Sequence, residues 1–216
     1  MKVSLIDTIK YGQMEYQQLN ILYSFRRCPY AIRARMALNY ADIQYQYREI
    51  LLKNKPQSML SYSAKATVPV LITKDGIIDE SIDVMHWSLS QFDPDKWLLQ
   101  PQQNNLIELC DKQFKPQLDR YKYSDRHELT EDEYRDEVLW FLDLLDKRLQ
   151  RHSQLFSDNV SMADISIFPF IRQFAFVDKQ WFDDSTYTYL QKWLTGHLQS
   201  DLFIKVMEKH PLWSDK

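Results

Sequence analysis

The hydrophobic pattern near the start of the chain changes from strand to helix within twenty residues. A short apolar run, Ile21 to Ser24, predicts a strand, and Ile32, Met36 and Tyr40 then recur at the spacing of one helix face. We expect this helix to begin at Pro29, because proline has no N–H and a φ that already suits the first helical turn. A strand followed directly by a helix predicts the first unit of an α/β fold.

Two more strand patterns, a hairpin and a second helix complete this unit. Tyr45 and Tyr47 alternate with polar residues, and the preceding helix can serve as the crossover to a parallel strand. Asp75-Gly76 is a turn signal between two apolar runs, which predicts an antiparallel hairpin. The expected elements are strands over 44–50, 68–72 and 77–78 and a helix over 81–92, with an irregular polar segment over 53–65.

The pattern changes again at Asp93-Pro94-Asp95, after which only helical periodicity continues, from about Asn104 to the end. Within it, Ser161 and Asp164 have the spacing of a reciprocal helix cap, with aspartate in place of the usual glutamate or glutamine. A second feature is an apolar stripe formed by Val138, Leu142, Leu145 and Leu149. The predicted organisation is an N-terminal extension over 1–19, an α/β domain over 20–92, a linker over 93–100 and an all-helical domain over 101–216.

Composition and charge argue against several classes of function. The 216 residues are 44% hydrophobic, enough for a substantial core, and the net charge of -3 gives no basic field for nucleic acid. The first 18 residues do not resemble a signal peptide, and no apolar run is long enough to cross a membrane. The five histidines show no metal-binding spacing, and three glycines offer no phosphate loop. We therefore expect a cytoplasmic protein without nucleic acid, membrane or metal partners.

The two cysteines are Cys28 and Cys110, whose spacing suggests neither a disulfide framework nor a zinc site. Cys28 directly precedes Pro29 and so occupies the N-cap position, where free N–H groups and the helix dipole stabilise a thiolate. With Arg26 and Arg27 beside it, we expect a thiol pKa lowered into the range of roughly 3.5–7.5. The alternative is a small apolar residue in a turn. Cys110 is expected to be a buried helical residue.

Five separated segments resemble motifs of one enzyme family. The strand and helix order with Cys-Pro-Tyr at the first helix is similar to the thioredoxin fold of glutaredoxins, and the added helical domain resembles a cytosolic glutathione transferase of the omega-like, cysteine-bearing class. The resemblance covers nearly everything after residue 20. The segments are Phe25-Arg-Arg-Cys-Pro-Tyr-Ala31, Leu52-Lys-Asn-Lys-Pro56, Val68-Pro-Val-Leu71, Glu80-Ser81 and Ser161-Met-Ala-Asp-Ile-Ser-Ile-Phe-Pro169.

This resemblance implies a thioredoxin-like domain that binds glutathione as co-substrate, followed by the all-α domain, and a homodimer. Cys28 would form a mixed disulfide with glutathione, in a thiol transferase or reductase reaction on a small disulfide or electrophile. Ala31 stands where dithiol glutaredoxins have a second cysteine, so an internal disulfide cannot form there and the reaction would use Cys28 alone. The implied glutathione-binding residues are Phe25, Pro29, Lys55, Val68, Pro69 in the cis form, Glu80 and Ser81.

Other interpretations of the same residues stay open at this stage. Without the family resemblance, Lys55 would be interpreted as a solvated loop charge, and Glu80-Ser81 is also consistent with a helix cap. Tyr23 and Ser24 lie near the place where other glutathione transferase classes have a catalytic tyrosine or serine. The alternative functions are conjugation of glutathione to electrophiles and a binding protein without catalysis. The second substrate has no recognisable signature in the sequence.

Overall fold

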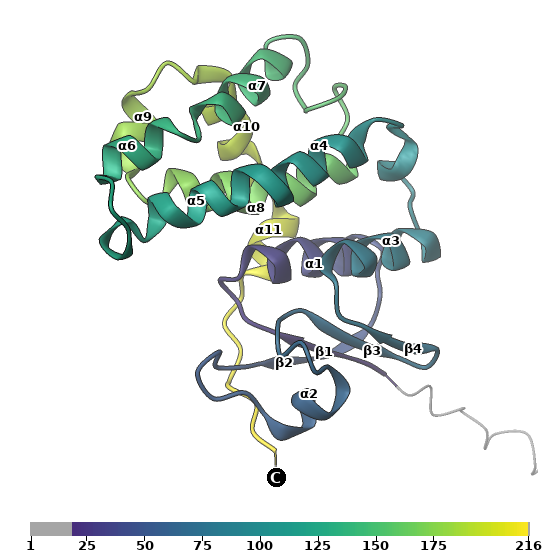
Figure 1. Cartoon of the computed structure of the whole chain (residues 1–216). Helices are drawn as coiled ribbons and strands as arrows, with labels where there is room; N and C mark the ends of the chain where they lie inside the picture. The colour runs from purple at the N-terminus through teal and green to yellow at the C-terminus, as the bar shows by residue number, and fades with distance from the viewer. Residues whose placement is uncertain (1–18, 216) are drawn as a thin grey trace, which may run out of the picture.

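The structure is a computed structural model that describes residues 19–215. The predicted N-terminal extension lies almost wholly outside the described residues. Within them, an α/β domain is followed by an all-helical domain, as the hydrophobic pattern predicts (Figure 1).

The α/β domain contains one four-stranded mixed sheet. Its strands are β1 (Asn20–Ser24), β2 (Tyr45–Glu49), β3 (Val70–Thr73) and β4 (Gly76–Ile78), in the order β2-β1-β3-β4. β1 pairs in parallel with β2 and antiparallel with β3, and β3 pairs antiparallel with β4. The predicted parallel pair and hairpin are both confirmed. The third strand begins two residues later than predicted because Pro69, which follows a cis peptide bond at Val68, has no N–H for the ladder.

The helices of this domain cover the two faces of the sheet. α1 (Pro29–Tyr40) and α3 (Ser81–Gln91) lie between the sheet and the helical domain, and α2 (Gln57–Tyr62) lies on the other side (Figure 1). The prediction that residues 53–65 are irregular was wrong, since they contain α2. Met59 is the one buried residue of that helix, so its sequence shows no apolar periodicity.

The helical domain is built around α8 (Met162–Ala175), almost all of whose residues are buried. α4 (Gln103–Leu109) continues through a π-helical turn (Cys110–Phe114) into α5 (Lys115–Lys122), forming one long helix across the domain (Figure 1). Further helices are α6 (Glu131–Asp136), α7 (Leu139–Leu149), α9 (Lys179–Asp184), α10 (Thr188–Leu198) and α11 (Asp201–Val206), with short 3-10 turns at Trp97–Leu99 and Ser124–Arg126. The predicted apolar stripe ending in α7 is buried, as expected.

The reciprocal cap predicted at the start of α8 is present. The carboxylate of Asp164 accepts hydrogen bonds from the Ser161 N–H at 2.9 Å and the Ser161 hydroxyl at 2.6 Å. Both residues are buried, so this cap lies inside the domain.

The last residues return from the helical domain to the sheet. They run past the β2 edge (Figure 1), where the Trp213 N–H donates to the Glu49 carbonyl at 2.8 Å. The carboxylate of Asp215 then accepts hydrogen bonds from the N–H and hydroxyl of Ser58 at the start of α2. Sequence periodicity gave no sign of this contact, because it consists of one bridge and not a strand.

Among the helices of residues 19–215, none combines the length and apolar character needed to span a membrane.

Candidate functional site

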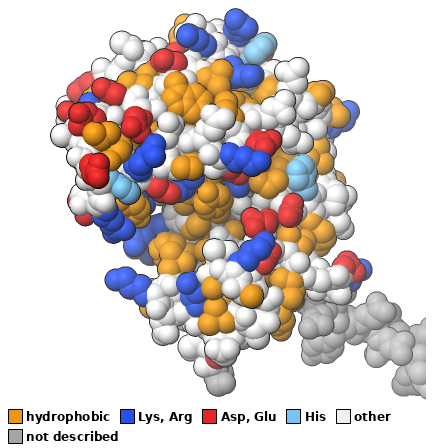
Figure 2. Space-filling view, viewed as in Figure 1, with side chains coloured by type: hydrophobic (Ala, Val, Ile, Leu, Met, Phe, Trp, Pro, Cys, Tyr) orange, Lys and Arg blue, Asp and Glu red, His pale blue; other side chains and the backbone are white. Residues whose placement is uncertain are grey.

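A cavity of about 500 Å³ lies where α1, α3 and the segment before β3 meet. Figure 2 shows that the surface is hollowed between the two domains, with Lys and Arg side chains on both sides of the hollow. Four residues of the predicted glutathione site, Val68, Pro69, Glu80 and Ser81, line the cavity together. The full lining is Tyr30, Lys65, Thr67, Val68, Pro69, Asp79, Glu80 and Ser81.

Cys28 is not one of the lining residues, but it lies next to Val68, which is. It occupies the N-cap of α1 with Pro29 in the first turn, as predicted, and its Sγ is 3.9 Å from the carbonyl oxygen of Val68. Ala31 stands in the turn that follows, and Cys110 is fully buried in the helical domain. Cys28 is therefore the cysteine that a molecule in this cavity can reach.

The electrostatics of Cys28 differ from the sequence prediction. Burial raises its pKa above the ordinary value of 9.0 and outweighs the backbone N–H groups of Ala31 and Tyr30, which act in the opposite direction. The cations that lower the pKa are Arg35 and Lys115 rather than Arg26 and Arg27. The helix N-terminus lowers the thiol pKa, as predicted, but desolvation raises it by more, so the net shift is upward.

Charged side chains at the far end of the cavity form a compact group. The ammonium of Lys65 lies 2.9 Å from Asp79 and 2.7 Å from Glu80, and the hydroxyl of Ser63 donates to Asp79 at 2.6 Å. These hydrogen bonds raise the pKa of Lys65. The group offers a cation and two carboxylates to a zwitterionic ligand.

Ser81 is held by a buried arginine from α1. The Arg33 Nε–H donates to the Ser81 hydroxyl oxygen at 3.0 Å, while its two terminal nitrogens donate to the carboxylate of Asp111 at 2.9 and 2.8 Å. Arg33 is 2% exposed and also lies over the rings of Tyr30 and Phe170. Arg33 uses one of the two lone pairs of the Ser81 oxygen, so the hydroxyl hydrogen stays available to donate to a ligand.

The remaining predicted residues lie outside the cavity lining. Lys55 is half-buried ahead of α2, whereas Lys65 supplies the cation that the cavity contains. Phe25 packs in the small core beside Cys28, and Pro29 is buried. Glu80-Ser81 does start α3, as the alternative interpretation expects: Glu80 is the N-cap residue and Ser81 the first helical residue. No side-chain capping bond forms there, so Ser81 is not a capping hydroxyl.

Tyr23 and Ser24 are engaged elsewhere. The Tyr23 hydroxyl contacts Ser58 at 2.7 Å and the guanidinium of Arg48, and the Ser24 hydroxyl accepts from Arg35 at 2.6 Å. Both side chains are fully buried. Neither hydroxyl is placed to activate a thiol in the cavity.

Sequence reasoning missed Tyr30, Lys65, Thr67, Asp79 and the Arg33–Asp111 pair. Tyr30 and Asp79 adjoin residues that the motifs did identify, so proximity in sequence was a usable signal. Arg33 and Asp111 are 78 positions apart, and no local pattern connects them. Within residues 19–215, no group of three or more His, Cys, Asp or Glu side chains is placed to hold a metal ion.

Two family models match the chain. The model of the glutathione S-transferase N-terminal domain matches residues 22–97, and that of the C-terminal domain matches residues 128–196. No curated protein matches the chain in sequence.

Solved structures share the fold. Glutathione transferase Omega 3C from Trametes versicolor is 18% identical, with a TM-score of 0.73 over 90% of this chain and 91% of that one. A tau-class glutathione S-transferase from mango, Mangifera indica, is 19% identical, with a TM-score of 0.73 over 89% and 94%. A glutathione transferase from Pseudomonas putida, solved with one glutathione disulfide per subunit, is 18% identical, with a TM-score of 0.74 over 90% and 93%. These neighbours belong to several classes, so they support the fold without selecting a class.

Proposed function

Because the chain belongs to the glutathione S-transferase family, we propose that it is an omega-like thiol transferase that uses glutathione and forms a mixed disulfide at Cys28. The observation that carries this proposal is the position of Cys28, at a helix N-cap and 3.9 Å from the carbonyl oxygen of Val68, a residue that lines the cavity. The Pseudomonas putida relative was solved with glutathione disulfide, a molecule of the same chemical class as the proposed substrate.

Glutathione has two carboxylates and one ammonium, and the cavity offers complementary groups. The backbone of Val68 is available to the cysteinyl part, next to Cys28. The hydroxyl of Ser81 can donate to the γ-glutamyl carboxylate, while Glu80 and Asp79 can accept from its ammonium and Lys65 can pair with a carboxylate. Lys55, which the family resemblance assigns to the glycyl end, stays a prediction.

The proposed reaction has two exchange steps. The Cys28 thiolate attacks the glutathione sulfur of a mixed disulfide, so that a bond forms between Cys28 and glutathione and the substrate leaves as a thiol after taking a proton. A second glutathione thiolate then attacks the glutathione sulfur on Cys28, which forms glutathione disulfide and returns the Cys28 thiolate. No second protein cysteine is required, and Cys110 is too deeply buried to supply one.

Turnover of a small mixed disulfide by the purified protein tests this proposal. With hydroxyethyl disulfide and glutathione we expect turnover by the native protein and by Cys110→Ala, and loss of turnover in Cys28→Ser. Peptide mass mapping after exposure to glutathione disulfide should place the adduct on Cys28. An adduct on Cys110, or full turnover by Cys28→Ser, would contradict the mechanism.

The raised pKa of Cys28 favours a second candidate function. A thiol that stays protonated can donate a weak hydrogen bond to the thiolate of bound glutathione, which suits conjugation to an electrophile. In that case Cys28→Ser should keep conjugating activity toward a chloronitrobenzene substrate. If the native protein shows neither disulfide reduction nor conjugation, a non-catalytic binding function is the better interpretation.

We also propose that the protein is a cytoplasmic homodimer that pairs the α/β domain of one copy with the helical domain of the other. Family membership supports this arrangement. Light scattering at micromolar concentration should give twice the chain mass, and a monomer would contradict it.

A further inference from the structure

The helical domain brings a positive charge close to Cys28 at the start of α5. Lys115 is the first residue of that helix, and its side chain is only 12% exposed. Its ammonium lies 5.9 Å from the centre of the Tyr30 ring, in the first turn of the helix that Cys28 caps. Lys115 is also one of the two cations whose charge lowers the pKa of Cys28. The reacting sulfur therefore has a lysine from the second domain near it.

Two arginines meet beside α11, in the same region. The carbonyl of Arg26, in the loop before α1, accepts from Arg35 at 2.7 Å, and Arg35 in turn donates to the Val206 carbonyl of α11 at 3.1 Å. The guanidinium of Arg172, in α8, lies 5.7 Å from the centre of the Phe203 ring, also in α11. Burial lowers the pKa of Arg172, and the positive charge of Arg26 lowers it further.

Neither arginine has its charge balanced by an acid. Arg26 and Arg172 form no ion pair within residues 19–215, and in that range the buried Nε–H of Arg172 finds no hydrogen-bond acceptor. Two rings hold the Arg172 guanidinium instead, Phe176 at 5.1 Å and Phe203 at 5.7 Å. A guanidinium fixed by stacking keeps its N–H groups available to an anion. A second cation beside an unpaired buried donor thus indicates an anionic ligand.

The acids of this region are already engaged. Asp119 pairs with Lys115, and Glu49 accepts from the Arg26 N–H at 3.0 Å and from the Tyr47 hydroxyl. Figure 2 shows Lys and Arg side chains on both sides of the hollow between the domains. None of the cations named here lines the proposed glutathione cavity, whose own cation is Lys65. The positive charge near Cys28 is therefore additional to the charge that glutathione would use.

We propose that the second substrate is an acidic thiol, presented as its mixed disulfide with glutathione, and that Arg26 and Arg172 bind its carboxylate. The identity of this substrate rests on the proposed reaction at Cys28. In that reaction the Cys28 thiolate forms its bond with the glutathione sulfur, and the acidic thiol leaves with the electron pair of the broken S–S bond. Lys115 stabilises the departing thiolate until it takes a proton.

Alkylation of Cys28 measures the charge around the sulfur without any turnover. Iodoacetate and iodoacetamide both react with the thiolate, so the ratio of their rates does not depend on the Cys28 pKa. Only the anionic reagent is attracted by nearby cations. We expect this rate ratio to be about tenfold higher for the native protein than for 2-mercaptoethanol, and to fall as salt is added. A ratio no higher than that of 2-mercaptoethanol would overturn the proposal.

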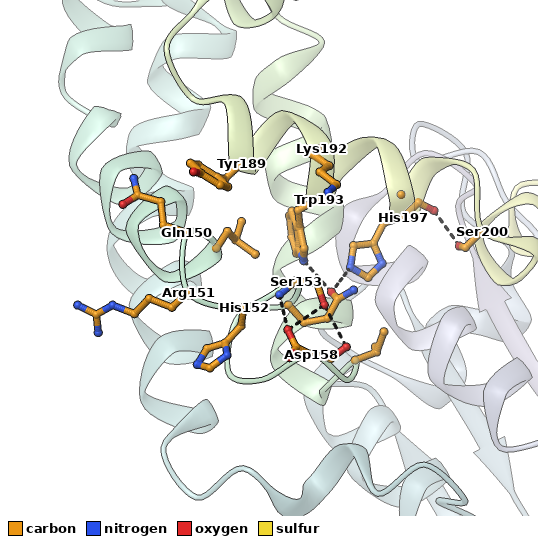
Figure 3. A pocket seen from close by; sticks show the side chains of 14 residues that line it. Gln150, Arg151, His152, Ser153, Asp158, Tyr189, Lys192, Trp193, His197 and Ser200 are labelled. Atoms are coloured by element: carbon orange, nitrogen blue, oxygen red, sulfur yellow. Dashed lines mark hydrogen bonds between the residues drawn. The ribbon is translucent and has the colours of Figure 1, made fainter.

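Three variants locate the anion, and each has a control with the same change of charge. Arg26→Gln, Arg172→Gln and Lys115→Gln should each lower the rate ratio about threefold, the effect of one partly exposed charge. Arg151→Gln and Lys192→Gln should leave it unchanged, because Figure 3 shows these two residues around a different cavity, between α10 and the loop after α7. Arg26→Gln keeps the backbone hydrogen bonds of Arg26, and unfolding temperature checks that every variant is folded.

Two results with these variants contradict the location. Unaltered rate ratios in Arg26→Gln, Arg172→Gln and Lys115→Gln would overturn the proposal. A ratio lowered in Lys65→Gln and in none of those three would also overturn it, because the anion would then lie in the proposed glutathione cavity.

Two mixed disulfides of glutathione test the class of substrate. One contains 3-mercaptopropionate and the other its neutral isostere 3-mercaptopropionamide, so the pair differs by a single charge. We expect kcat/KM of the native protein to be about tenfold higher for the acidic disulfide, and Arg172→Gln to lose most of this preference. Equal kcat/KM values for the two disulfides would overturn the proposal.

The two assays distinguish this proposal from the proposed reaction. If neither disulfide is turned over but the alkylation ratios behave as expected, the thiol transferase reaction fails and the anion site stands. If both disulfides are reduced equally well and the alkylation ratio matches that of 2-mercaptoethanol, the reaction stands and the anion site fails.

Discussion

At the scale of single residues, Cys28 shows how two local effects compete. The helix N-cap and nearby cations favour the thiolate, and the surrounding apolar side chains disfavour it. The two effects have opposite signs, and the sequence reveals only the first, because burial depends on what packs around the thiol.

The pH dependence of Cys28 alkylation follows from this balance. Because burial raises its pKa, the rate with iodoacetamide should keep increasing past pH 9, with a midpoint above the ordinary thiol value of 9.0. Cys110, which is fully buried, should react only after unfolding. A midpoint below about pH 7.5 in the native protein would show that the helix start dominates after all.

Glu80 offers a test at the other end of the cavity. Glu80→Gln should weaken glutathione binding by about tenfold, since the lost partner of the ammonium is a charged but partly exposed group. Asp83→Asn is the matched control, because it removes the same charge from the same helix outside the cavity. Titration calorimetry measures both. If the two variants bind glutathione with equal affinity, Glu80 does not contact the ammonium of the ligand.

At the scale of elements, the start of α8 combines a local signal with contacts that no local signal predicts. The spacing of Ser161 and Asp164 predicts the cap. The structure adds that Asp164 also accepts from the Leu155 N–H at 2.9 Å and the Trp193 indole at 3.0 Å. One carboxylate thus joins the preceding loop, α8 and α10.

Asp164→Asn should therefore destabilise the protein far more than the loss of an ordinary helix cap does. An amide NH₂ would face buried donors that now bond a carboxylate, and we expect a loss of roughly 3–5 kcal/mol in the free energy of unfolding. Asp158→Asn, exposed in the loop that precedes α8, should cost much less. Urea denaturation followed by circular dichroism compares them. A loss for Asp164→Asn no larger than that control would mean that the buried donors find other partners.

At the scale of the whole molecule, the two domains are connected by buried polar contacts as well as by apolar packing. Arg33 in α1 pairs with Asp111 in the π-helical turn of the helical domain. Arg35 in the same helix donates to the carbonyl of Val206 at 3.1 Å. These contacts connect the helix that carries Cys28 to the second domain.

Asp111→Ala should be strongly destabilising because it leaves the Arg33 guanidinium buried without its partner. We expect a loss of about 3–5 kcal/mol in the free energy of unfolding, measured in urea. Glu108→Gln, at an exposed ion pair one turn earlier, is the matched control and should cost no more than about 1 kcal/mol. The double variant Arg33→Met with Asp111→Leu should recover much of the loss. A double variant as unstable as Asp111→Ala would show that the cost is not the unpaired charge.

The sequence by itself determined the elements whose cause is local. The helix at Pro29, the hairpin at Asp75-Gly76 and the cap at Ser161 each follow from a few neighbouring residues, and the structure contains all three. Motif positions likewise placed Val68, Pro69, Glu80 and Ser81 in one predicted site, and the fold brings them to one cavity.

The tertiary structure alone decided the properties that depend on distant parts of the chain. The pKa direction of Cys28 requires the packing around it, and the presence of Lys65 in the cavity lining requires the path of the loop. The Arg33–Asp111 pair joins two segments that no short-range pattern relates. Hydrophobic periodicity specifies which face of an element is buried, but only the folded chain specifies which element covers it.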